Sequence, residues 1–421
     1  MSIKPIKRLR QLLAPALSAA LLLAPALLLN SAHAAGFWDN LKIQIGNHNQ
    51  NTFYTENGQI SMKLDGNMTF AKTEDDVIAI DGKAWIEEKR NNQILHIEFS
   101  GSNNGPITRR YMVDGHDHAL DADGKRWLAS VIPVFLRESA IDAEKRVARI
   151  FNQGGAAAVL TEIEHIDNNF ARRIYLDLLC QTGPLNDDAI QRVLTISSRI
   201  NSDFDTRTVL LTLIKQQTLS TPIQTQLLNR VAKIDSDFEK RTVMVALAPK
   251  LGNEPALLAA WQKALAKVSS DFDTRTVLMA LEKRDDLSAA QIESAIQASN
   301  HIDSAFDHRT VLVAYANHIR PDTPALAASY LKSAQKIDSD FDRRTVLIAL
   351  LNHGKLDKSG FEHFLDALKG MSSDFDKRTV LIALAKQMPA DDALVEQYHQ
   401  IASTLGDFDR TQAEKALKRV N

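Results

Sequence analysis

A nine-residue phrase, Ser-Asp-Phe-Asp-x-Arg-Thr-Val-Leu, recurs along the C-terminal two thirds of this chain. Its phenylalanines are 34, 34, 34, 34, 35, 34 and 33 residues apart, at Phe170, Phe204, Phe238, Phe272, Phe306, Phe341, Phe375 and Phe408. A fixed period of this length indicates one supersecondary unit stacked on copies of itself, each burying a face that its neighbour supplies. The chain is therefore expected to be mainly an elongated repeat protein with about seven to eight units.

Each copy is expected to form two helices joined by a turn. A serine followed three residues later by an acid, as at Ser202 and Asp205, is the capping-box pattern that begins a helix. Loops such as 220–222 and 320–324 then end this helix, and apolar residues at helical spacing follow. Residues 161–421 are thus predicted to form an α-solenoid of 34-residue helix-turn-helix repeats, similar to HEAT or TPR repeats.

Charged residues occupy fixed places in the repeat. An arginine follows each of the first seven phenylalanines by three residues, and in most of these repeats an acid precedes that arginine by four, which is a favourable order on a helix. Stacked units would place these groups in a row, where each guanidinium can also reach the next repeat's carboxylate. We interpret the row as a structural charge ladder, and contact with a partner and binding of a metal or an anion remain alternatives. Its members are Arg207, Arg241, Arg275, Arg309, Arg344, Arg378, Asp203, Asp237, Asp271, Asp340 and Asp374.

The residue two places after each phenylalanine changes identity while its neighbours stay fixed. Such drift suits a position that faces solvent. These residues are therefore the predicted partner-contact candidates: Lys240, Thr274, His308, Arg343 and Lys377.

The N-terminus has the pattern of an export signal. Four basic residues precede an apolar run, and Ala32-His33-Ala34 fits the small-x-small cleavage pattern. Residues 1–34 are therefore expected to be a signal peptide cleaved before Ala35, which leaves 387 of 421 residues in the periplasm, with no second apolar stretch long enough to span a bilayer. Because the removed segment carries no acid, the net charge falls from −2 to −6. Nucleic acid is an unfavourable partner for such a charge.

Residues 35–122 show short alternating runs typical of antiparallel strands, and five or six strands are expected. Asp65-Gly66 and Asp81-Gly82 are predicted to be tight hairpin turns. Residues 123–160 change to helical spacing, with a break near Gly154-Gly155, and are expected to link the sheet to the solenoid and to cap its first repeat. The fold class is therefore α+β, with the domain boundary near residue 122.

Motifs of known catalytic chemistry are missing from the sequence: it has no HExxH pair, GxSxG elbow, phosphate loop, CxxC pair or EF-hand loop. No catalytic residue, cofactor or metal is predicted. His116 and His118 are the nearest approach to a metal site, and without a third ligand we expect a solvated hairpin end there. The lone Cys180 lies in an apolar run and is expected to be a buried thiol.

Three segments carry a resemblance to a known group of proteins. They are Thr108–Gly115, Asp121–Leu128 and Ala143–Leu160, the last with a break between Ile150 and Gly154. Together with the repeats they resemble the extracytoplasmic part of BlaR-type membrane metallopeptidases, or companions of these enzymes. The zinc motif and the transmembrane bundle of the peptidase are missing from this sequence, so no catalytic role carries over. The resemblance implies a periplasmic sensing or docking module.

Three hypotheses about function follow. The first is a non-catalytic periplasmic adaptor that binds another envelope or membrane protein through its solenoid, because stacked helix pairs create extended binding surfaces. The second is a metal- or small-molecule-binding protein, or an enzyme, with its site at the junction of sheet and solenoid. The third is a purely structural envelope protein. The partner's identity and the oligomeric state do not follow from the sequence.

Overall fold

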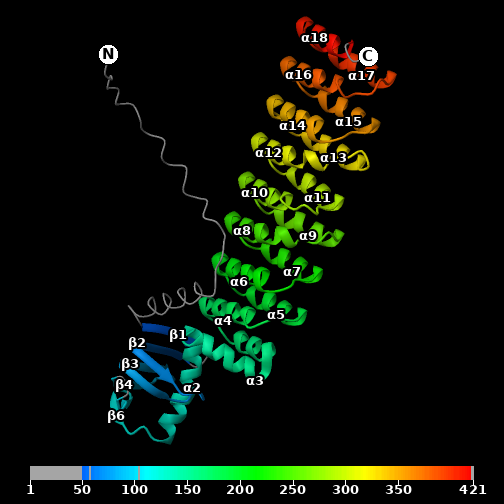
Figure 1. Ribbon diagram of the computed structural model, residues 1–421. Coiled ribbons are helices and arrows are strands. Elements are labelled where there is room, and N and C mark those ends of the chain that lie inside the picture. Colours follow the sequence, from blue (N-terminus) through cyan, green and yellow to red (C-terminus); the bar gives the residue numbers. More distant parts are fainter. Residues whose placement is uncertain (1–49, 56–57, 103–104, 419–421) are drawn as a thin grey trace, which may run out of the picture. The chain divides into compact units, whose positions relative to one another are not determined.

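The computed structural model describes residues 50–55, 58–102 and 105–418 (Figure 1). A small antiparallel sheet precedes a long series of packed helices, and the predicted α+β class with a helical solenoid is confirmed. The predicted signal peptide, its cleavage site and the start of the predicted β-domain lie outside the described residues. The chain divides into two compact units, one ending at Phe135 and one beginning at Leu136.

The sheet has six strands in sequence order, so each strand pairs with the one before it. Every pairing is antiparallel, as expected for consecutive hairpins. The strands are β1 (Gln50–Thr55), β2 (Gly58–Phe70), β3 (Val77–Arg90), β4 (Gln93–Gly101), β5 (Thr108–Val113) and β6 (His116–His118).

The prediction of hairpin turns at Asp65-Gly66 and Asp81-Gly82 is wrong. Both pairs lie inside long strands, and Gly66 is the register partner of Gly82. Their φ angles are +113° and +121°, and a Cβ on Gly82 would lie 2.0 Å from the carbonyl oxygen of Asp65. These glycines are required because two strands approach closely at a point where a side chain has no room.

The observed turns use other residues with positive φ. Asn91 and Asn92, with φ of 47° and 60°, connect β3 to β4. Asp114 and Gly115, with φ of 49° and 80°, connect β5 to β6. Two consecutive residues of positive φ characterise the two-residue turn that matches strand twist.

Helix α2 (Ala122–Ser139) covers the sheet with its first residues. The Trp127 indole donates a hydrogen bond of 2.9 Å to Glu88, and its ring lies 5.6 Å from that of Tyr111. The ring of Phe135 lies 6.4 Å from that of Phe70. Most of α2 thus belongs to the sheet's unit, beyond the predicted boundary at residue 122, because the apolar face of the sheet needs a cover.

The solenoid begins with α3 (Ala143–Glu164), which breaks at Gly154 and Gly155 as the sequence indicates. The first helices of the repeats pack against one another in series, and so do the second helices, forming two layers (Figure 1). The first helices are α4 (Asn169–Gln181), α6 (Asp203–Gln216), α8 (Asp237–Leu247), α10 (Asp271–Glu282), α12 (Ala305–Tyr315), α14 (Asp340–His353), α16 (Asp374–Ala385) and α18 (Asp407–Lys418). The second helices are α5 (Asp187–Ser197), α7 (Thr221–Val231), α9 (Pro255–Leu265), α11 (Ala289–Ser299), α13 (Pro324–Ala334), α15 (Lys358–Lys369) and α17 (Asp392–Ala402), and the 3₁₀ turns η1 (Ala248–Lys250) and η2 (Ala316–His318) follow α8 and α12.

Serine caps begin the first helices, as predicted. In six of them the serine hydroxyl accepts the backbone N–H of the acid three residues later, at Ser202, Ser236, Ser270, Ser304, Ser339 and Ser373. Because the serine satisfies this N–H, the carboxylate of the same acid remains available for another contact.

Apolar residues fill the space between the two layers. Trp261, Tyr315, Tyr330 and Tyr398 are fully buried there, and Cys180 is buried as expected. Of α18, the last described helix, only Ala413 and Leu417 are buried. Within the described part of the chain, no helix is both long and apolar enough to cross a membrane.

The close approach of β2 and β3 makes a stability prediction. Gly82→Ala is expected to lower the free energy of unfolding by about 1–3 kcal/mol, because the new Cβ meets backbone and φ is positive. Gly115→Ala is the control: its φ is also positive, but nothing lies within 4 Å of its Cβ position, so a smaller loss is expected. Urea unfolding of both variants checks this, and equal losses would contradict it.

Candidate functional site

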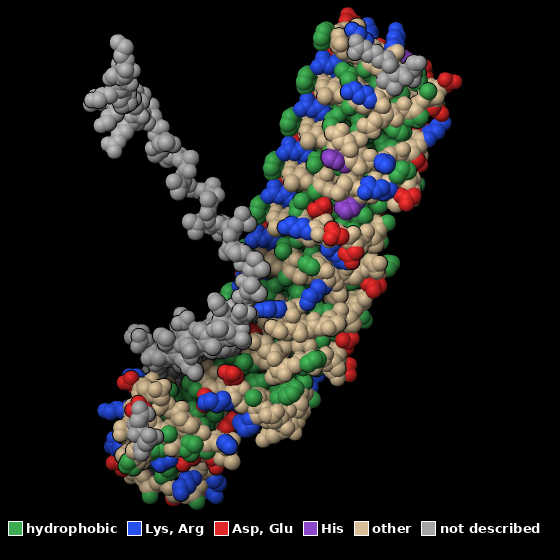
Figure 2. Space-filling model, in the orientation of Figure 1, with side chains coloured by type: hydrophobic (Ala, Val, Ile, Leu, Met, Phe, Trp, Pro, Cys, Tyr) green, Lys and Arg blue, Asp and Glu red, His purple; other side chains and the backbone are tan. Residues whose placement is uncertain are grey.

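The phenylalanines of the repeated phrase face solvent. In the six central repeats, at Phe204, Phe238, Phe272, Phe306, Phe341 and Phe375, they are between 51% and 57% exposed. Phe170 and Phe408, at the two ends of the row, are 38% and 68% exposed. Each central ring belongs to the second residue of a first helix, so the rings recur along one edge of the solenoid, and Figure 2 shows hydrophobic and basic side chains alternating there. We call these eight residues the Phe row.

The arginines of the predicted ladder lie between these rings. Each guanidinium carbon lies 4.6–5.0 Å from the ring centroid of its own repeat. From Arg241 onward it also lies 5.4–5.8 Å from the ring of the next repeat. Rings and cations therefore alternate along the solenoid in an extended series of cation–π contacts.

The same arginines form ion pairs between repeats. Each contacts the acid that directly follows the next repeat's phenylalanine. The distance from the arginine nitrogen to the carboxylate oxygen is 2.7 Å for Arg207 and Glu239, 2.5 Å for Arg241 and Asp273, and 2.6 Å for Arg344 and Asp376. Arg275, Arg309 and Arg378 pair with Asp307, Asp342 and Asp409 in the same way. The rings and the ion pairs largely cover these guanidiniums, because the arginine side chains from Arg207 to Arg378 are only 16–20% exposed.

The acids predicted to pair with arginine within a helix have a different role. Asp203, Asp237, Asp271, Asp340 and Asp374 each accept a backbone N–H from the loop that begins the next repeat. Although partial burial opposes ionisation, hydrogen bonds from Ser373 and Ser372 lower the pKa of Asp340. These carboxylates fix the following loop, and the arginine's partner is the other acid of the phrase.

The five predicted partner-contact residues are buried, and the prediction that they face solvent is wrong. Lys240, Thr274, His308, Arg343 and Lys377 are 2–6% exposed. Lys240 Nζ donates to the Lys267 carbonyl at 2.6 Å, and Arg343 Nη2 donates to that of Ile337 at 2.7 Å. Several different donor side chains can reach the carbonyls and hydroxyls between repeats. The residue type at this position therefore varies from repeat to repeat, although the position is buried.

The first repeat contains a buried acid. Asp177 in α4 lies at a position where later first helices have an apolar residue such as Val245. Burial raises its pKa to about 6, although Arg173, 3.4 Å away, favours the charged form. Arg173 also pairs with Asp205 at 2.7 Å.

The predicted weak metal candidates, His116 and His118, lie on β6 and are exposed. Among the described residues they belong to no cluster of three or more potential ligands. The open face of the sheet near them has a hollow of about 440 Å³ that includes Trp85, Lys63 and Arg110. Trp85 stacks on His96 at 5.5 Å there.

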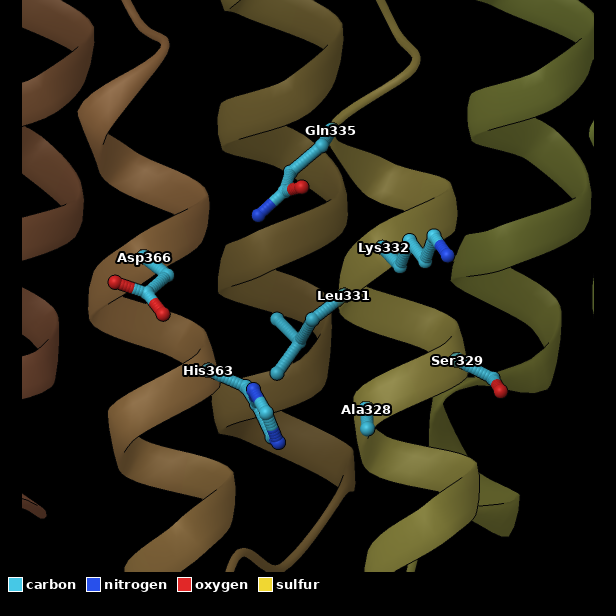
Figure 3. Close-up of a pocket in the computed structure, with 7 residues that line it drawn as sticks. All are labelled: Ala328, Ser329, Leu331, Lys332, Gln335, His363 and Asp366. Atoms are coloured by element: carbon cyan, nitrogen blue, oxygen red, sulfur yellow. The ribbon is translucent and has the colours of Figure 1, made fainter.

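A second hollow, of about 370 Å³, lies on the layer of second helices. Figure 3 shows His363 and Asp366 on α15, Lys332 on α13 and Gln335 directly after the end of α13. Most of the residues that line it are polar, and one of them, Ser329, already donates to Glu293 at 2.7 Å. We use this hollow as a comparison surface for the Phe row.

Comparison with protein-family models, with curated proteins and with solved structures finds no match to this chain.

The ion pairs between repeats make a second stability prediction. Arg275→Gln removes a half-buried charge pair with Asp307 and is expected to cost about 1.5–3 kcal/mol. Arg410→Gln is the control, because its pair with Asp407 is exposed and such pairs contribute at most about 1 kcal/mol. Chemical denaturation measures both, and an Arg275 variant as stable as the control would refute a structural role for the pair.

His308 makes a prediction about pH. Burial, and secondarily the nearby charge of Lys336, lowers its pKa from 6.5 to about 4, against the attraction of Asp271. A base with a lowered folded-state pKa stabilises the fold above its unfolded pKa, so this contribution is lost as the pH falls from about 6.5 towards 4. The loss amounts to about 3 kcal/mol.

His308→Thr tests this directly, because Thr206 and Thr274 occupy the same position in other repeats. The variant is expected to lose less stability than the wild type between about pH 7.5 and pH 4.5. Urea unfolding at the two pH values gives the comparison, and an unchanged acid sensitivity would show that His308 does not titrate as proposed.

Proposed function

We propose that this protein is a non-catalytic binding scaffold that holds another envelope protein on the Phe row of its solenoid. The observation that supports it is the exposure of eight aromatic rings along one edge. A phenylalanine offers roughly 200 Å² when fully buried, so the half-exposed rings together leave roughly 800 Å² for a partner. That is about the area that each side contributes to a standard protein interface.

The contacts of the rings within the chain are weak compared with what a partner can supply. A cation–π contact at an exposed site contributes about 0.5–1 kcal/mol. Covering the remaining roughly 100 Å² of one ring contributes about 2.5 kcal/mol. Folding alone therefore leaves most of the favourable energy of the rings unrealised.

The proposal includes export to the periplasm, on the basis of the N-terminal sequence. The resemblance to the extracytoplasmic parts of BlaR-type metallopeptidases or their companions supports a docking role within the same compartment. The sequence has none of the catalytic motifs that would assign chemistry to the protein itself.

Crosslinking in intact cells tests the scaffold. Replacing Phe238, Phe272 and Phe306 together with alanine is expected to abolish recovery of the partner that the tagged wild type captures. The control replaces Lys332, His363 and Asp366 with alanine on the other layer, and full recovery is expected there.

Each outcome bears on the proposal. Loss in the phenylalanine variant alone supports the Phe row as the binding surface. Loss in the control alone would move the surface to the second helices, and recovery of nothing but the protein itself would contradict the proposed function. Circular dichroism of each variant establishes that the helices are intact.

A further inference from the structure

The spacing of the Phe row is set by the stacking of the helices. Arg275 lies 4.9 Å from the Phe272 ring and 5.6 Å from the Phe306 ring. The two centroids are therefore no further apart than the sum of these distances, about 10.5 Å, and packed helices lie about 8–10 Å apart between their axes. A chain that lies along the row meets one ring about every 10 Å.

A polyproline II helix has the matching period. It makes one turn in three residues and rises about 3.1 Å per residue, so the same face returns about every 9.3 Å. A β-strand returns to the same face about every 6.6 Å, which does not match. A heptad-patterned α-helix returns to the same face after about 10.5 Å, which exceeds the 8–10 Å between axes of packed helices.

The Phe row is narrow, which favours the thinner occupant. In most central repeats, acids precede and follow the phenylalanine at the start of the helix. One helical turn later comes a threonine whose hydroxyl donates to the carbonyl of that phenylalanine, at 2.8 Å for Thr208 and 2.7 Å for Thr276. A ridge one ring wide between polar groups suits one residue per turn, and aromatic surfaces are the usual receptors of polyproline II segments.

Charge limits the composition of the occupant. In most repeats, two acids and one arginine adjoin the phenylalanine in the sequence, for example Asp271, Asp273 and Arg275 beside Phe272, which leaves one net negative charge per repeat. An acidic chain would be repelled at every turn, whereas basic residues between the prolines would be attracted.

We propose that the Phe row binds a proline-rich, acid-poor segment of its partner in the polyproline II conformation, with a proline against one ring per repeat. This inference rests on the proposed function, because it names the part of the partner that the scaffold holds. It predicts binding along the row in units of three residues.

Fluorescence anisotropy with labelled peptides tests this proposal. The probe is a Pro-Pro-Lys repeat of about 24 residues, which spans eight turns of polyproline II helix. Pro-Pro-Gln and Pro-Pro-Glu repeats of equal length separate conformation from charge. Saturable binding of the lysine and glutamine peptides is expected, with the glutamate peptide at least about tenfold weaker.

Variants of the full chain locate the site. Phe272→Ala with Phe306→Ala interrupts the row and is expected to weaken peptide binding at least about tenfold, whereas Phe408→Ala only shortens the row and is expected to cost less than about threefold. Phe272→Leu with Phe306→Leu keeps apolar area without an aromatic ring, and an intermediate loss is expected. The Lys332, His363 and Asp366 alanine variant should bind as the wild type does.

Other occupants give different results. Failure of all three peptides to bind would overturn the polyproline inference. Capture of a partner in cells that depends on the phenylalanines would then still support the proposed scaffold function. Sedimentation velocity showing a dimer that Phe272→Ala and Phe306→Ala dissolve would assign the row to a second copy and overturn the inference. Peptide binding that survives the double alanine variant would also overturn it.

Discussion

The ion pair between each arginine and the acid at the start of the next first helix sets the register of the whole solenoid. Its partners lie 31–33 residues apart, for example Arg378 and Asp409 or Arg241 and Asp273, so only stacked repeats can form it. The serine cap makes the pair possible, because its hydroxyl satisfies the backbone of the same acid and leaves the carboxylate for the arginine. Helix initiation and repeat stacking therefore depend on the same three residues.

The exposure of the Phe row follows from this arrangement. Once the arginine and the residue before it turn inward to contact the neighbouring repeat, the phenylalanine three residues earlier covers the guanidinium from outside. Arg275, for instance, is 19% exposed beneath the Phe272 ring, which is 52% exposed. The contact that orders the repeats thus also orders the rings, so the surface is preorganised before any partner arrives.

Much of the architecture could be predicted from the sequence, because the period and the serine caps are local patterns. The exposure of the rings could not, since an apolar residue in a helix normally indicates core; the position of Phe272 just after a cap, three residues before Arg275, was the available signal. The residue type at the position of His308 varies between repeats, which wrongly indicated exposure to solvent. It varies because several donors satisfy the same buried acceptors. The hairpin turn predicted at Asp81-Gly82 was also wrong, since the glycine allows two strands to approach closely and does not form a turn.

Phe408 shows how far the Phe row extends. It lies on α18, the last described helix, is the most exposed ring and contacts Arg378. The row therefore reaches the last described helix, and its length follows the number of repeats. Identical sites at a fixed spacing allow one chain to engage several rings at once, so overall affinity rises steeply with the number engaged. In this way, contacts that are weak one by one can together bind a long segment tightly.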